Sequence, residues 1–452
     1  MKLKIKISNL QVSRIIAIKK DILNQFLRIE FYICPKTATI LMAKANVFYF
    51  NPTCELAVAN GSFSYIPPLL LQKMERDLEM IPFVFTTEND FVLTDDAPSE
   101  EFKRQLIEAG FKLPTFCNLA ELISLPTNSF NAIYPWGWSP AAHFKLKSLK
   151  EKCGGKFKTS VVFNWTNEHK MLLERSSSLE FLINLLDKYP CDWFIDRLMI
   201  GVRVSDVREI ETLLLKNRAL VLKAPVSSSG RGIQVIRKAT LNNSNKQWIS
   251  GVLKQHKYLI AEPFLEKMAD FSFQFKISSN SKIDYLGFSF FETNSNGQYL
   301  GTLLHPDLNK ILGEVNPEML RIMIESTAKA IQEALNDSLY AQLHRGYLGV
   351  DAMIFKHQNQ IMIQPCIEIN CRMNMGILSM QLEKKIHPKS RGNFKLFYER
   401  QRNFKNFVLE QKKINPTKIL DNKLCSGFLS LTEPNSSKAF GAYINIYFDG
   451  AR

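Results

Sequence analysis

Apolar and polar residues alternate along several segments in the second half of the chain. In the segment 270–278, DFSFQFKIS, phenylalanines occupy every second position between polar residues. This period of two places all the aromatic side chains on one face of a β-strand. A second aromatic segment, YLGFSFFET at 285–293, follows after a short polar stretch. We therefore predict that the two segments pair as neighbouring strands.

Other segments repeat apolar residues with the period of an α-helix. The stretch LLLQKMERDLEM is apolar at Leu70, Leu71, Met74 and Leu78, and it follows two prolines that suit the start of a helix. Further helices are predicted at 99–110, 178–189, 206–217, 248–254 and 317–335. Strands are predicted at 47–50, 220–223, 234–237, 258–264, 348–355 and 360–371. Strands that alternate with helices indicate an α/β protein.

The same patterns divide the chain into four parts. Residues 1–41 are a basic extension without a core-forming pattern, and we expect them to lie outside the fold. A smaller α/β domain is predicted at 42–175, and the main domain at 176–385. Residues 386–452 are expected to be helical to about Lys413 and to end in two short strands that pack on the main domain.

The composition narrows the class of protein. Hydrophobic residues make up 46% and charged residues 22% of the chain, which is ordinary for a globular protein. The formal charge of +15 is compatible with anionic partners, but no nucleic-acid motif accompanies it. The eight cysteines are scattered without a Cys-x-x-Cys pair, which favours reduced thiols in a cytoplasmic protein. No apolar run approaches the ~20 residues of a membrane span.

Residues 221–233, VLKAPVSSSGRGI, are a candidate phosphate-binding loop. An apolar strand ends at Lys223, because Pro225 cannot donate a hydrogen bond to a sheet. The small residues that follow let backbone N–H groups point into one concavity, which suits phosphate. The stretch is neither a Walker A loop nor a dinucleotide fingerprint, and by itself it is equally typical of a solvent-exposed loop.

Two segments near residue 360 carry a cluster of acidic and amide side chains. Asp351 stands in the apolar segment GVDAMIF, where a carboxylate is costly unless it meets a cation or a donor. In PCIEINCRMNMG, the residues Glu368, Asn370 and Arg372 alternate and so share one face of a strand. Pairing through the intervening KHQNQ turn brings Asp351 to the same face. Carboxylate and amide oxygens suit Mg²⁺, although the polar outward face of an ordinary strand is the alternative interpretation.

The segment between these motifs, LIAEPFLEKMADFSFQF, is a candidate nucleotide hinge. A strand that ends at Glu262 could offer backbone groups to an adenine edge, with Phe264 and Leu265 against the ring. Glu266 or Asp270 could accept hydrogen bonds from ribose hydroxyls. A plain connection between two domains remains the alternative.

The order of these features resembles the ATP-grasp superfamily over about residues 206–380. The resemblance implies an α/β (α+β ATP-grasp) fold, preceded at 42–175 by the smaller α/β domain found in such ligases. It assigns metal binding to Asp351, Glu368 and Asn370, and catalysis to Lys223 and Arg372. The ATP-binding residues that it implies are Lys223, Ser227, Ser228, Ser229, Gly230, Arg231, Gly232, Glu262, Phe264, Leu265 and Asp270.

Members of this superfamily usually activate a carboxylate as an acyl phosphate, which an amine or a thiol then attacks. The resemblance therefore implies an ATP- and Mg²⁺-dependent ligase (Mn²⁺ could substitute) acting on a small-molecule carboxylate and an amine or peptide. A phosphotransferase of the same fold and a nucleotide-binding regulatory protein without turnover are the alternatives. The complete set of metal ligands argues against the last.

Three further residues are candidate substrate contacts: Arg345, Tyr347 and Asn374. His344 and Arg345 are equally well explained as charges at a helix end. The aromatic segment Tyr134–Trp138 could line a substrate pocket or form a packed loop.

Overall fold

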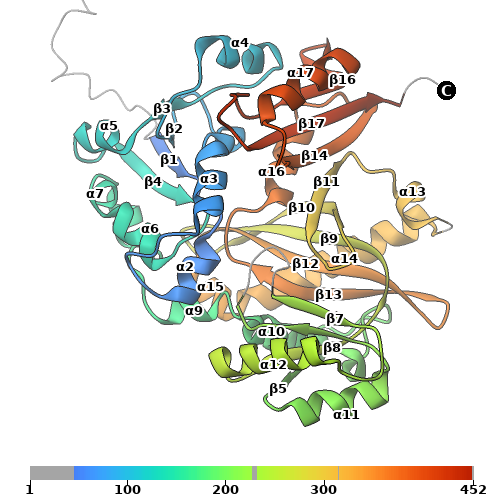
Figure 1. Cartoon of the computed structure of the whole chain (residues 1–452). Helices are drawn as coiled ribbons and strands as arrows, with labels where there is room; N and C mark the ends of the chain where they lie inside the picture. Colours follow the sequence, from blue (N-terminus) through green and yellow to red (C-terminus); the bar gives the residue numbers. More distant parts are fainter. Residues whose placement is uncertain (1–44, 227–231, 314, 450–452) are drawn as a thin grey trace, which may run out of the picture. The chain divides into compact units, whose positions relative to one another are not determined.

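The computed structural model describes residues 45–226, 232–313 and 315–449. The described residues form one compact unit, and the predicted extension 1–41 lies outside them. Three β-sheets organise this unit, one parallel and two antiparallel (Figure 1). The predicted α/β class is therefore confirmed.

The N-terminal sheet is parallel, with strands in the order β3-β2-β1-β4. Its strands are β1 (Ala45–Tyr49), β2 (Phe91–Leu93), β3 (Thr115–Cys117) and β4 (Phe130–Pro135). The accompanying helices are α2 (Cys54–Asn60), α3 (Leu69–Asp77), η1 (Ile81–Phe85), α4 (Glu100–Glu108), α5 (Leu119–Ser124), α6 (Pro140–Lys145), α7 (Lys147–Lys150), α8 (Gly155–Lys158) and α9 (Glu168–Met171). As predicted, α3 starts directly after Pro68.

The large sheet has nine strands in the order β13-β12-β9-β10-β11-β14-β17-β16-β15, and all neighbours are antiparallel. Its strands are β9 (Glu266–Ile277), β10 (Ile283–Thr293), β11 (Tyr299–Leu304), β12 (Gly346–His357), β13 (Gln360–Asn370), β14 (Ser390–Tyr398), β15 (Lys418–Leu420), β16 (Lys423–Ser430) and β17 (Phe440–Phe448). The predicted pairing of the two aromatic strands is confirmed, since Phe271 lies opposite Phe290.

The alternation in β9 separates the two faces of the large sheet. Phe271, Phe273 and Phe275 are fully buried in the main core. Helices α10 (Arg175–Lys188) and α14 (Pro317–Asn336) contribute to the same core. The intervening Ser272 and Gln274 face the other way and are also buried, under other parts of the chain. The polar face of β9 is covered by other parts of the chain, and buried polar residues of this kind indicate a candidate functional site.

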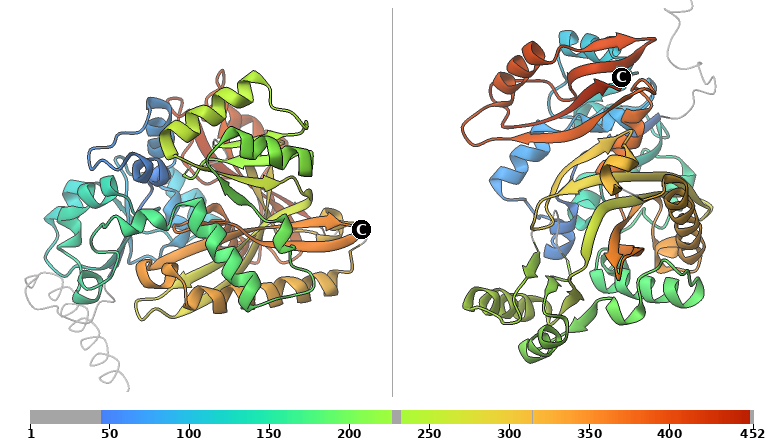
Figure 2. Two further views of the ribbon diagram at one scale, coloured as in Figure 1. Left: turned by 90° about the horizontal axis from the view of Figure 1, so that it is seen from below. Right: turned by 90° about the vertical axis from the view of Figure 1, so that its right-hand side faces the viewer.

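A small antiparallel sheet carries the candidate phosphate loop. Its strands, in the order β5-β8-β6-β7, are β5 (Val202–Val204), β6 (Leu220–Lys223), β7 (Ile233–Ile236) and β8 (Leu259–Pro263). With α11 (Val207–Asn217) and α12 (Asn243–His256) it forms the end of the unit opposite the C-terminal strands (Figure 2). Helix α12 is longer than the predicted 248–254, because a capping box between Asn242 and Asn245 starts it earlier.

The C-terminal prediction was wrong in part. The stretch expected to be helical to Lys413 contains strand β14 and only one further helix, α17 (Phe404–Ile414). Strand β14 pairs with β11 on one side and β17 on the other, so tertiary pairing decides its conformation. The remaining helices are η2 (Arg197–Met199), α13 (Leu308–Leu312), α15 (Leu339–Leu343) and α16 (Met375–Glu383).

One hydrophobic core joins the N-terminal region to the C-terminal strands. Phe50, Leu78 and Trp136 pack in the same cluster as Phe394 and Ile444. Met74 of α3 and Met373, which follows β13, pack with this shared core, so it holds α3 near the end of β13, where the candidate chemistry lies. Within the described ranges, no helix combines the length and apolarity needed to cross a bilayer.

Candidate active site

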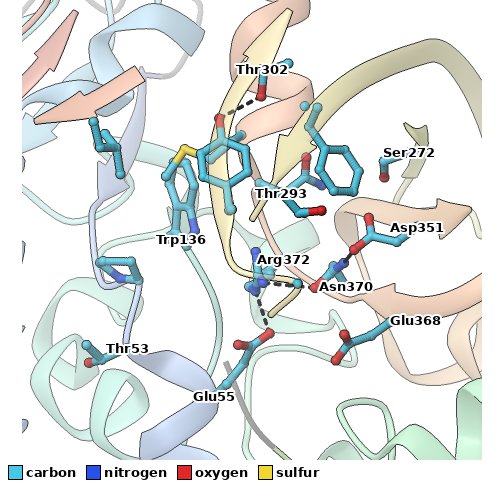
Figure 3. Close-up of a pocket in the computed structure, with 18 of the residues that line it drawn as sticks. Thr53, Glu55, Trp136, Ser272, Thr293, Thr302, Asp351, Glu368, Asn370 and Arg372 are labelled. Atoms are coloured by element: carbon cyan, nitrogen blue, oxygen red, sulfur yellow. Dashed lines mark hydrogen bonds and ion pairs between the residues drawn. The ribbon is translucent and has the colours of Figure 1, made fainter. Parts of the chain in front are cut away.

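A cavity of about 270 Å³ lies between the polar face of the large sheet and the N-terminal helices. It is lined by Ser272 of β9, Asp351 of β12, and Glu368 and Asn370 of β13 (Figure 3). The sequence predicted that the last three would converge, and the register confirms it, because Asp351 lies directly opposite Glu368. The hairpin therefore brings two carboxylates and an amide to one wall.

The electrostatics of this wall favour a cation. Asn370 Nδ2 donates to Asp351 Oδ2 over 2.9 Å. Burial, followed by the charge of Glu368, raises the pKa of Asp351 to about 6. Two adjacent carboxylates repel each other, and a divalent cation between them would relieve that repulsion.

The donor set fits a hard divalent cation such as Mg²⁺. Among the described residues there is no group of three His, Cys, Asp or Glu side chains arranged to hold a metal ion. The candidate set is instead two carboxylates, Asp351 and Glu368, with the amide oxygen of Asn370. Mg²⁺ commonly takes only one or two carboxylates and completes its shell with water and substrate phosphates.

Arg372 occupies the centre of the cavity wall. Its Nη2 donates to Asn370 Oδ1 over 2.9 Å, and its Nε donates to Glu55 Oε1 over 2.7 Å. Burial by itself would lower the pKa of Arg372, but the neighbouring acidic groups, with the Glu55 carboxylate first and Asp351 also contributing, together outweigh it and hold the pKa above its ordinary value. The predicted catalytic arginine is thus held in place from two sides.

Glu55 and Arg175 are site residues that sequence reasoning missed. Glu55 is on α2, 317 positions from its partner Arg372, and no local sequence pattern predicts such a contact. Arg175, the first residue of α10, donates through Nη2 to Glu368 Oε2 over 3.2 Å and through Nη1 to the carbonyl of Ala224 over 2.6 Å. A basic residue at a helix start opposes the helix dipole, which is the one signal that could have marked Arg175.

The predicted ATP-phosphate residues are only partly described. Ser227, Ser228, Ser229, Gly230 and Arg231 lie outside the described residues. The predicted hairpin around them is confirmed, because β6 pairs with β7 and the Gly232 carbonyl accepts from Ala224 N over 2.8 Å. The Lys223 ammonium forms an ion pair with Glu262 Oε2 over 2.7 Å, so strands β6 and β8 bring these two candidates together.

The remaining hinge candidates lie apart from the cavity wall. Phe264 is 40% exposed, with the Arg237 guanidinium 4.5 Å above its ring, and Leu265 packs against the main core. Asp270 is buried and accepts from Lys267 Nζ and from Thr293 Oγ1, the latter over 2.6 Å. Of these residues, Thr293 lines the cavity, and the ribose contact expected for Asp270 stays a prediction.

The three tentative substrate residues separate into two places. Asn374 lines the main cavity and caps α16, accepting from Ile377 N over 3.1 Å. Arg345 and Tyr347 line a second, smaller cavity of about 20 Å³. Arg345 donates there to the carbonyls of Ala341 and His344 at the end of α15, the arrangement of the helix-end alternative. Trp136 lines both cavities.

Comparisons with known proteins define the fold. No family model and no curated protein sequence matches the chain. The solved structure of an N5-carboxyaminoimidazole ribonucleotide synthetase bound to ADP matches with a TM-score of 0.50 at 11% identity, over 92% of this chain and 95% of that one.

Two further structures match less well. The biotin carboxylase domain of the Hydrogenobacter thermophilus 2-oxoglutarate carboxylase has a TM-score of 0.47 and 12% identity, over 89% of this chain and 86% of that one. The Staphylococcus aureus N5-carboxyaminoimidazole synthetase has a TM-score of 0.44 and 14% identity, over 89% and 92%. All three are ATP-grasp enzymes, and the match to the first shows that this chain has the ATP-grasp fold, as the sequence predicted.

Proposed function

We propose that this protein is an ATP- and Mg²⁺-dependent ligase that activates a carboxylate as an acyl phosphate for attack by an amine. The observation that carries the proposal is the convergence of Asp351, Glu368, Asn370 and Arg372 on one cavity wall. The matched synthetase of the same fold is bound to ADP, which supports a nucleotide in this cavity.

Each side chain on the wall has a role in this reaction. Asp351, Glu368 and Asn370 would hold Mg²⁺, which would neutralise charge on the nucleotide phosphates. Arg372 stabilises the negative charge that builds on the transferring phosphoryl oxygens. Arg175 fixes the Glu368 carboxylate and ties it to the segment that follows Lys223.

The proposed reaction has two steps. A carboxylate oxygen attacks the γ-phosphorus of ATP, a bond to the β–γ bridging oxygen breaks, and ADP leaves. The amine nitrogen then attacks the carbonyl carbon of the acyl phosphate, phosphate leaves, and the nitrogen loses a proton. The products are ADP, phosphate and an amide.

The test is product analysis with the purified full chain, MgATP and pools of carboxylates and amines. We expect ADP and phosphate to appear together with an amide, and ¹⁸O placed in the carboxylate to appear in the released phosphate. A stable phosphorylated acceptor would favour the phosphotransferase instead. Turnover without transfer of ¹⁸O to phosphate would reject the acyl-phosphate route.

A further inference from the structure

The side of the cavity opposite the carboxylates is apolar. Helices α2 and α3 and the adjacent loops supply this side, which we call the apolar wall. Its residues are Phe50, Pro52, Leu56, Leu71, Met74, Leu78 and Trp136. Phe50, Leu71, Leu78 and Trp136 are at most 6% exposed and pack behind the wall, while Pro52, Leu56 and Met74 are partly exposed and present hydrocarbon to the cavity. A preformed apolar surface gains free energy when hydrocarbon covers it.

Glu55 stands between the apolar wall and the catalytic residues. Figure 3 shows Arg372 with Glu55 on one side and Asn370 on the other, and Asp351 beyond Asn370. Glu55 is 5% exposed, and its Oε1 accepts from Arg372. Its Oε2 is buried and has no hydrogen-bond partner among the described residues. A buried acceptor without a partner costs folding free energy. A bound molecule that donates a hydrogen bond to this oxygen would recover that cost.

The charges around the cavity restrict what that molecule can be. The basic side chains among the described lining residues are Arg175 and Arg372, and each contacts a carboxylate. Among the described residues that line the cavity, no further cation lies on the apolar wall to receive a phosphate or a second acidic group from the substrate. The wall with Glu55 therefore suits an uncharged hydrocarbon body that ends in a hydrogen-bond donor.

We propose that the amine substrate has an apolar, uncharged body, as in branched alkyl amines and arylalkyl amines. Its nitrogen donates to Glu55 Oε2, and its hydrocarbon covers Pro52, Leu56 and Met74. This inference rests on the proposed ligase function and narrows it to one substrate class. The nitrogen is thereby held next to Arg372, where the acyl phosphate forms.

Calorimetric titration of the full chain, with and without MgADP, tests the substrate class. The probes are 3-methylbutylamine against 3-aminopropanamide, which are similar in size and shape, and phenethylamine against 3-phenylpropionate, which lacks the nitrogen. We expect 3-methylbutylamine to bind at least about 10-fold more tightly than 3-aminopropanamide, the scale for differences in fit to an apolar pocket. We expect the same margin for phenethylamine over 3-phenylpropionate. Equal affinities within either pair, or no binding of either amine, would overturn the proposal.

Two variants with a matched control locate the binding. Met74→Trp fills the cavity and should abolish binding of 3-methylbutylamine, whereas Leu69→Trp on the same helix, at a side chain 83% exposed, should leave it unchanged. Glu55→Gln keeps an acceptor oxygen for Arg372 but replaces the other oxygen with a donor, so it should weaken binding of 3-methylbutylamine at least about 10-fold. Melting temperatures identify any variant that fails to fold. Unchanged affinity for 3-methylbutylamine in both folded cavity variants would refute the proposed position.

The outcomes separate this inference from the ligase proposal. MgATP turnover that shows no preference for apolar amines rejects the apolar amine class and leaves a ligase. Binding of 3-methylbutylamine and phenethylamine to a protein that does not bind MgATP supports the apolar wall and rejects the ligase.

Discussion

The raised pKa of Asp351 predicts how the metal-free protein responds to pH. The pKa is 3.8 for an ordinary aspartate and about 6 in the folded chain. The folded protein therefore keeps the Asp351 proton to a higher pH than the unfolded chain does. The contribution of this group to stability is fully present below pH 3.8 and is lost as the pH rises through 6.

The size of the effect follows from the pKa difference. About two pKa units correspond to about 3 kcal/mol between the protonated and the ionised site. Because Asp351 opens onto the cavity and is not sealed from water, this value is a ceiling. Asp351→Asn removes the titration and keeps an oxygen that accepts from Asn370. In metal-free buffer, the variant should be more stable than the wild type at pH 8, by up to about 3 kcal/mol.

The assay is urea unfolding of both proteins in EDTA at pH 5 and pH 8. About half of the effect, roughly 1.5 kcal/mol, falls between these two values, and comparison with the variant cancels the other titrating groups. Adding Mg²⁺ at pH 8 should stabilise the wild type and leave Asp351→Asn nearly unchanged, since only the native site binds the ion. Parallel pH profiles in EDTA would refute the raised pKa. Equal stabilisation of both proteins by Mg²⁺ would remove Asp351 from the metal site.

Three other substitutions test separate parts of the structure. Glu368→Gln keeps an acceptor for Arg175 but removes a metal-binding charge. Mg²⁺-dependent ADP release should therefore be lost while the circular dichroism spectrum stays native. Full activity would exclude Glu368 from the site. Arg372→Ala should lower kcat by roughly 10²-fold with a smaller change in ATP affinity, since its charge is needed most in the transition state; a loss confined to ATP affinity would argue against that role. Asp77→Ala removes the acceptor for the Ala439 and Phe440 N–H groups, which lie 2.8 and 3.0 Å from Asp77 Oδ2. It should lower the free energy of unfolding in urea by about 2–5 kcal/mol, whereas Asp77→Asn keeps an acceptor and should lower it less.

Local periodicity let the sequence determine much of the large sheet. The phenylalanines of β9 alternate with polar residues, and strand geometry places them on opposite faces wherever the strand lies. The short KHQNQ turn likewise fixed the pairing that sets Asp351 opposite Glu368. These features depend on residues close in sequence, so the sequence alone predicts the candidate metal wall.

Only the tertiary structure decided the other half of the site. Glu55 meets Arg372 across 317 positions and Arg175 meets Glu368 across 193, and neither pair leaves a local signature. The sequence predicted the apolar stripe of α3. Helical periodicity does not show, however, whether such a stripe packs into the core or lines a cavity. That choice depends on the core that the N-terminal region shares with the C-terminal strands, because this packing brings α3 near the end of β13.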